Sequence, residues 1–177
     1  MNIKNGIFVA KSVIMEFQKE LKEEAIRLGL CDKWQREWGT PDVDALCDKF
    51  IRGMDFCIKH DFPKVEYIHS HFNETDLHRN GIYTQGQCVS INKKHVVALG
   101  NCEVDVYVTE NDICDIYARH TSSIDLYVGD NAFVYISTYD KCKIRVICKG
   151  NNARICVSKF GGTLYCGDNF DKIAIKK

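Results

Sequence analysis

Several features that would point directly to a function are missing from the sequence. The 177-residue chain has two prolines, no stretch rich in serine, glycine and proline, and no apolar run approaching the 18 residues of a membrane span. Residues 1–10 lack the sustained apolar core and small-residue cleavage site of a signal peptide. We therefore expect a folded cytoplasmic protein with no membrane partner and no disordered tail.

An excess of charge of either sign is also missing. Lysine and arginine together number 24, and so do aspartate and glutamate. The chain as a whole therefore has no field that would attract nucleic acid or an anionic membrane. No nucleotide, metal or catalytic motif stands out either, so we expect no nucleic-acid partner, no cofactor and no catalytic residue that could be named from the sequence.

The chain has ten cysteines but no Cys-x-x-Cys motif. Cys114 and Cys148 fall at inward positions of the repeat described below, where cysteine packs as a small hydrophobe. His69 and His71, in the densest histidine cluster, would point about 200° apart on a helix and have no third ligand at a fixed spacing. We predict reduced structural thiols and no metal site.

What the sequence does have is an internal repeat of ten residues. Residues at positions minus two and plus two from each repeat centre are small or branched, and the residues between them are mostly polar or aromatic. This alternation predicts short strands with one buried face, joined by turns such as residues 110–112 and 129–131. The repeat centres are Val106, Ile116, Leu126, Ile136 and Val146.

Two architectures fit a ten-residue strand-turn unit. In a β-solenoid, two units form each coil of about twenty residues, and the stacked coils bury a thin core. In an antiparallel β-meander, successive units pair directly and helices cover the apolar face. The constant spacing and small inward residues favour the solenoid, although it would stack Asp105 on Asp125 at a cost that Arg145 in the next coil would offset in part.

The sequence before the repeat is typical of helices. Apolar periodicity predicts helices over residues 11–28, 32–38 and 40–59 and another after Pro63, with Gly29 ending the first and Thr40 capping the third. Residues 73–80 are polar and turn-like. We therefore predict an α+β protein with a helical head or cap, residues 1–78, and a β-repeat domain, residues 79–177.

Six strings of the sequence carry a family resemblance. They are residues 53–63 (GMDFCIKHDFP), 80–83 (NGIY), 99–102 (LGNC), 116–120 (IYARH), 135–140 (YISTYD) and 153–162 (ARICVSKFGG). In combination they resemble an uncharacterised family of Bacteroidetes proteins that pair a helical head with a β-repeat tail. The resemblance implies this layout over about residues 30–165 and supplies no activity, cofactor, partner or site residue.

The outward positions of the repeat form two series of side chains. One series reads Asp105, Asp115, Asp125, Tyr135, Arg145 and Arg154, and the other Tyr107, Tyr117, Tyr127, Ser137, Ile147 and Cys156. Aromatic faces stack on sugar rings while carboxylates accept hydrogen bonds from sugar hydroxyls. Asp105, Asp115, Asp125, Tyr107, Tyr117 and Tyr127 are thus the candidate residues for a ligand such as a carbohydrate. Equivalent positions in a repeat do not give two aspartates the different environments that acid–base catalysis needs.

Charge is segregated along the repeat. Residues 101–140 hold one basic and eight acidic side chains, whereas residues 141–177 hold nine basic and two acidic ones. Complementary fields favour salt-sensitive association, and the candidate basic residues are Lys141, Lys143, Arg145 and Arg154. We predict a non-enzymatic scaffold or protein-interaction module, self-associating through charge-complementary ends or binding another protein. Attraction within one molecule and a carbohydrate-binding or carbohydrate-active solenoid remain the alternatives.

Overall fold

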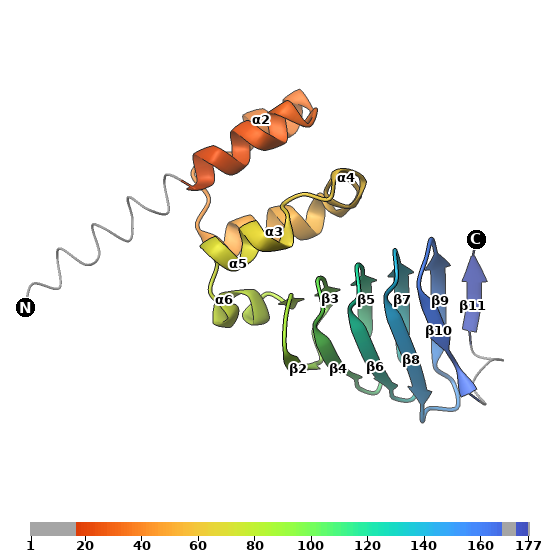
Figure 1. Ribbon diagram of the computed structural model, residues 1–177. Coiled ribbons are helices and arrows are strands. Elements are labelled where there is room, and N and C mark those ends of the chain that lie inside the picture. Colours follow the sequence, from red (N-terminus) through yellow and green to blue (C-terminus); the bar gives the residue numbers. More distant parts are fainter. Residues whose placement is uncertain (1–16, 168–172, 177) are drawn as a thin grey trace, which may run out of the picture. The chain divides into compact units, whose positions relative to one another are not determined.

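Helices occupy the first part of the chain and parallel strands the second (Figure 1). The computed structural model describes residues 17–167 and 173–176. The chain divides into two units between Asn73 and Glu74, five residues before the boundary predicted from the sequence. This architecture confirms the predicted α+β fold.

The N-terminal unit is built from short amphipathic helices. Its apolar core contains Phe17, Leu21, Ala25, Leu30, Trp38 and Leu46. The helices are residues 17–27, α2 (Asp32–Arg36), α3 (Val43–Arg52), α4 (Met54–His60) and α5 (Val65–His71).

The helix ends agree with the sequence analysis at one point and differ at two. Gly29 adopts a φ of 94° after the first helix, and Leu30 N–H donates to the carbonyl oxygen of Ala25, as in a Schellman cap. Asp42 rather than Thr40 caps α3, because its carboxylate accepts a hydrogen bond from Ala45 N–H at 2.9 Å. Gly53 divides the predicted helix 40–59 into α3 and α4. Residues 11–16 of the first predicted helix lie outside the described residues.

The second unit begins with a helix that the sequence analysis missed. Helix α6 (Glu74–Arg79) contacts β1 and buries Leu77. With six residues and one buried apolar side chain, it is too short to show helical periodicity. The strands that follow are β1 (Ile82–Tyr83), β2 (Gln87–Ile91), β3 (His95–Ala98), β4 (Glu103–Val108), β5 (Ile113–Ala118), β6 (Ser123–Val128), β7 (Phe133–Thr138), β8 (Lys143–Cys148), β9 (Arg154–Lys159), β10 (Thr163–Tyr165) and β11 (Ile173–Lys176).

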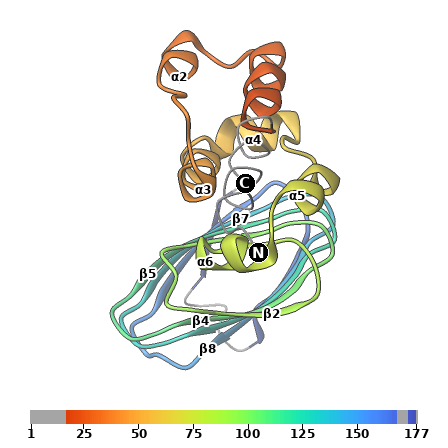
Figure 2. The same ribbon diagram turned by 90° about the vertical axis from the view of Figure 1, so that its left-hand side faces the viewer.

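These strands form a β-solenoid. Every pair is parallel, and the pairing joins alternate strands, so that Leu126 lies beside Val106 and Val146. One sheet has the order β1-β3-β5-β7-β9-β11 and the other β10-β8-β6-β4-β2. A view along the stack shows successive coils nearly superimposed, with one sheet on each side of a thin core (Figure 2). Pairing between units twenty residues apart excludes the antiparallel meander.

The repeat centres face the core, as their spacing predicts. Ile116, Leu126 and Ile136 are fully buried, and Cys102, Cys114 and Cys142 pack among them. Cysteine thus serves as a small apolar side chain in a core that is one side-chain layer wide on each sheet.

Most corners of the solenoid turn through a residue with a left-handed backbone, whereas the longer corner between β8 and β9 has no such residue. One residue with positive φ reverses the direction of the chain within a short corner. Glycine, asparagine, aspartate and histidine adopt this conformation more readily than other residues. The corner residues with positive φ between β1 and β10 are Gly86, Asn92, Gly100, Asn111, His120, Asn131, Asp140 and Gly162.

The predicted outward series is wrong beyond β8. Arg154 lies beside Phe133, and Cys156 lies beside Tyr135. The predicted rows step nine residues from Arg145 to Arg154, but the corner between β8 and β9 is one residue longer than the preceding corners, so that the actual step is eleven. Arg154 and Cys156 still point outward but lie two positions away from the predicted rows. Arg154 therefore does not continue the series of Asp105 and Arg145.

Candidate functional site

The most distinctive exposed surface is the outward side of the sheet formed by the even-numbered strands, which we name the outer face. Every second residue of each strand points outward, and equivalent outward residues of neighbouring strands lie side by side. They form three rows that run along the stack of coils. The first row is Gln87, Glu103, Ser123, Lys143 and Thr163; the second is Val89, Asp105, Asp125, Arg145 and Tyr165; the third is Ile91, Tyr107, Tyr127 and Ile147.

The solenoid brings together four of the six predicted ligand residues. Asp105 and Asp125 are neighbours on the outer face, as are Tyr107 and Tyr127. The other two predicted residues lie on β5, in the opposite sheet, where the Asp115 carboxylate is 3.5 Å from His95 Nδ1. Each ten-residue unit is half a coil, so consecutive units contribute to different faces.

Charges of opposite sign meet on the outer face. Arg145 Nε donates to Asp125 Oδ1 at 3.0 Å, and Arg145 Nη2 donates to Asp125 Oδ2. These bonds raise the pKa of the Arg145 guanidinium above its ordinary value. The predicted offset of the stacked aspartates by Arg145 is therefore present, and part of the charge segregation is satisfied within one molecule. A carboxylate with both oxygens held by arginine is poorly suited to act as a general acid.

Tyr107 and Tyr127 form a face-to-face stack. Their ring centroids are 4.6 Å apart, and their planes differ by 6°. Loss of solvent and the nearby Asp105 carboxylate raise the pKa of the Tyr127 hydroxyl. Each ring covers one face of the other, so the two facing surfaces are closed to a sugar ring. A sugar ring binds on an open aromatic face, so this geometry disfavours the carbohydrate interpretation.

The tyrosine stack should be measurable as an energetic coupling. In a double-mutant cycle of Tyr107→Ala and Tyr127→Ala, we expect a coupling of about 1 kcal/mol in the free energy of unfolding. Urea denaturation of the four proteins measures it. The cycle of Tyr107→Ala with Tyr117→Ala, on the opposite sheet, should give a coupling of less than about 0.5 kcal/mol. Equal couplings in the two cycles would show that the stack contributes nothing specific.

The predicted basic residues are only partly brought together. Lys143 and Arg145 are outward neighbours on β8, and both are exposed. Lys141 lies on the preceding corner, and Arg154 lies on the opposite sheet. The outer face thus has an acidic strand, β4, separated by β6 from a basic strand, β8.

Sequence reasoning missed the exposed apolar side chains at both ends of the outer face. Val89 and Ile91 on β2 are 59% and 61% exposed, and Tyr165 on β10 is 53% exposed. The outward direction of Val89 and Ile91 could have been predicted by applying the inward–outward alternation of β4 to the preceding coil. For β10 no such signal exists, because it follows the change of register at the longer corner.

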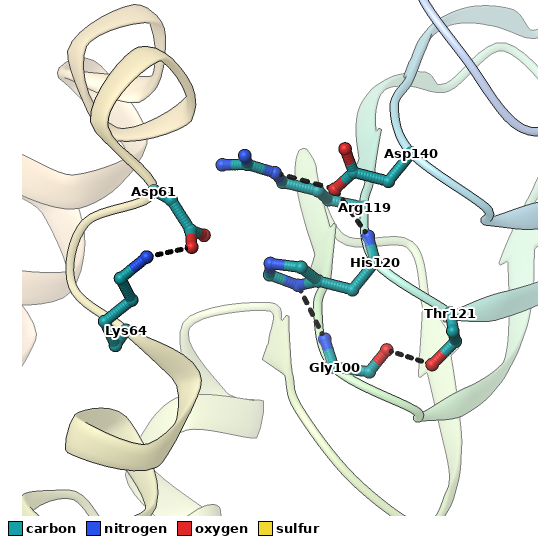
Figure 3. A network of polar contacts seen from close by, with 7 residues as sticks. All are labelled: Asp61, Lys64, Gly100, Arg119, His120, Thr121 and Asp140. Carbon is teal, nitrogen blue, oxygen red and sulfur yellow. Dashed lines mark hydrogen bonds and ion pairs between the residues drawn. The ribbon is translucent and has the colours of Figure 1, made fainter.

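A second polar cluster lies at the corner that contains His120 (Figure 3). Asp140 Oδ2 accepts hydrogen bonds from Arg119 Nε at 2.9 Å and from the backbone N–H of His120 at 3.2 Å. His120 Nδ1 in turn accepts from Gly100 N–H at 3.1 Å. Gly100, His120 and Asp140 occupy the same corner in three consecutive coils, so the network fastens the coils together.

A cysteine and a histidine meet near the start of the solenoid. Cys88 Sγ is 3.6 Å from His78 Nε2, and Cys88 is half-buried. Burial raises the pKa of the Cys88 thiol, with a further contribution from the Glu74 carboxylate. A nucleophilic cysteine needs the opposite shift, so this pair lacks the electrostatics of an activated thiolate.

The remaining chemistry-bearing groups do not converge. All ten cysteines are described, and each is a free thiol. Among the described residues, no three His, Cys, Asp or Glu side chains lie close enough together to hold a metal ion. No helix in the described part of the chain is both long enough and apolar enough to cross a membrane.

Comparisons with known proteins add no assignment. No protein-family model, curated protein or solved structure matches the chain. The resemblance to a Bacteroidetes family stays a prediction.

Proposed function

We propose that this protein is a non-enzymatic protein-interaction module that binds through its outer face. The observation that carries the proposal is the arrangement of charge on this exposed surface. Glu103 and Asp105 lie on β4, and Lys143 and Arg145 lie two strands away on β8. Rows of positive and negative side chains at fixed positions on a sheet can orient a partner protein and raise its association rate. These are the usual contributions of charge to a protein interface.

The outer face suits this role better than the ends of the solenoid. At the N-terminal end, helix α6 contacts β1, so stacking another strand there would require the helix to move. At the other end, β10 pairs with β8 and β11 pairs with β9. Two solenoids docked against each other through these basic ends would bring like charges together.

The carbohydrate alternative has less support. It needs tyrosine faces that are open to a sugar and carboxylates that are free to accept its hydroxyls. On the outer face the two tyrosine faces cover each other, and Asp125 is paired with Arg145.

The free thiols are consistent with a reducing compartment, so we place the protein in the cytoplasm.

Site-specific photo-crosslinking tests the proposal. A photoreactive phenylalanine analogue in place of Tyr107 should give a discrete cross-linked protein band when irradiated in cells of the organism that encodes the chain. The same analogue in place of Glu110, exposed at the corner after β4, is the control and should give no such band. The band should fade in lysates as salt is raised to about 500 mM, where the Debye length is near 4 Å.

Two results would overturn the proposal. Absence of any protein adduct at Tyr107 would remove the outer face as a protein-binding surface. An unchanged adduct after Glu103→Lys with Asp105→Lys would show that the charge pattern has no part in binding. Retardation in polysaccharide gels, abolished by Asp105→Asn, would instead establish the carbohydrate alternative.

A further inference from the structure

The outer face of one copy is complementary to the outer face of a second copy that is rotated by 180° about an axis parallel to the strands. We propose that its partner is a second copy of this chain, packed face to face about a two-fold axis parallel to β6. This inference rests on the proposed function and names the partner of the same surface. A rotation about that axis keeps each row opposite itself and reverses the order of the strands.

The three rows give complementary pairs under this rotation. In the first row, Glu103 meets the Lys143 of the second copy. In the second row, Asp105 meets Arg145 and Val89 meets Tyr165; in the third row, Tyr107 meets Ile147. Glu103 and Asp105 thus meet opposite charges, and the exposed Val89 of β2 meets the exposed Tyr165 of β10, whereas Ile91 has no residue of β10 opposite it.

The other simple arrangement is excluded by charge. A two-fold axis parallel to the stack would keep the strand order and reverse the strand direction. It would then set β4, with Glu103 and Asp105, against the β4 of the second copy, and β8 against β8. Like charges directly opposite each other are destabilising, so the face selects the axis along β6.

The centre of the interface carries the main cost of this arrangement. Asp125 lies on β6 and would face the Asp125 of the second copy near the two-fold axis. Each of these carboxylates is held by Arg145 of its own chain, which offsets the repulsion. The two tyrosine stacks would also meet there, through the Tyr127 of each copy.

The size of the face limits the strength of the dimer. Five strands about 4.8 Å apart and about six residues long give a projected area of roughly 500 Å² for each partner. The total is then about 1,000 Å², at the lower end for a specific interface. We therefore expect a dissociation constant in the micromolar range or weaker, and a dimer that weakens as salt is raised.

Charge exchange at Glu103 and Lys143 tests the arrangement. Both side chains are exposed, so the substitutions leave the core intact. The variants Glu103→Lys and Lys143→Glu should each weaken the homodimer about tenfold or more, because two symmetric pairs become repulsive. The double variant should recover an affinity near that of the unchanged protein. An equimolar mixture of the two single variants should form a heterodimer in preference to either homodimer.

Sedimentation velocity from about 5 to 500 µM, at about 20 and 500 mM salt, measures these equilibria. Glu110→Lys makes the same charge change away from the outer face and should leave the dimer unaffected. A protein that is monomeric at every concentration overturns the inference, and so does a dimer that the single variants do not weaken. A monomer whose Tyr107 adduct contains a different protein overturns this inference alone and leaves the proposed function intact.

Discussion

Leu126→Ala should lower the free energy of unfolding by about 3–5 kcal/mol. Leu126 is fully buried at the centre of β6 and lies beside Val106 and Val146 in the coils before and after it. A core this thin has few other side chains that could move in to fill the space. The loss should therefore approach the upper part of the range for leucine-to-alanine changes.

Ile91→Ala is the matched control for this prediction. It also shortens an aliphatic side chain on a strand of the even-numbered sheet, but Ile91 points outward and is 61% exposed. We expect it to change the free energy of unfolding by less than about 0.5 kcal/mol. Urea denaturation followed by the circular dichroism of the strands measures both variants. A cost for Leu126→Ala as small as that of Ile91→Ala would contradict the buried repeat.

Alkaline pH should destabilise the protein, because two buried thiols resist ionisation in the folded chain. Burial raises the pKa of Cys102 and of Cys114 from 9.0 to about 12, with the Asp115 carboxylate adding to the shift of Cys114. The unfolded chain releases these protons above pH 9 while the folded chain keeps them. The stabilisation is therefore complete below about pH 9 and is lost as the pH rises toward 12. Each thiol should cost about 1.4 kcal/mol per pH unit in that range.

The variant Cys102→Ala/Cys114→Ala isolates this effect. It should be less stable than the unchanged protein at pH 7, because two buried sulfur atoms are removed. Between pH 9 and 11, however, its free energy of unfolding should fall less steeply, by up to about 3 kcal/mol per pH unit. Urea midpoints measured at half-unit intervals give both slopes. Parallel curves for the two proteins would mean that these thiols ionise as easily in the folded chain as in the unfolded one.

The solenoid itself could be predicted because its signal is both local and periodic. The side chains at Val106, Ile116, Leu126 and Ile136 recur every ten residues, and the alternation around them specifies one inward face. The stacking of Asp105, Asp125 and Arg145 followed from the same spacing and is present as predicted. Each of these inferences needs only the repeat length and the period of a strand.

The errors occur where that regularity ends. One additional residue between β8 and β9 moves Arg154 and Cys156 out of the predicted rows, and β10, only three residues long, was missed. Helix α6 has too little apolar sequence to be recognised from its pattern. The positions of β9 and β10 depend on pairing with strands about twenty residues away, which a local sequence pattern does not contain.

The candidate site was predicted in part for the same reason. The spacing placed Tyr107 with Tyr127 but could not show that their rings stack, because a side-chain rotamer is not determined by the repeat. It also could not show that Arg119 and His120 join Asp140, since that network depends on the left-handed corners. Side-chain geometry at the corners therefore required the structure.

The corners have a consequence for how a gene of this kind can change in length. One coil contains two strands and two corners, and most of these corners turn through a left-handed residue. Duplication of a twenty-residue segment would add a complete coil and keep every later side chain on its own sheet. Duplication of ten residues would exchange the two sheets for the rest of the chain and break the rows of the outer face. Insertions or deletions of about sixty nucleotides, which encode one coil, should thus be tolerated, whereas those of about thirty nucleotides should be selected against.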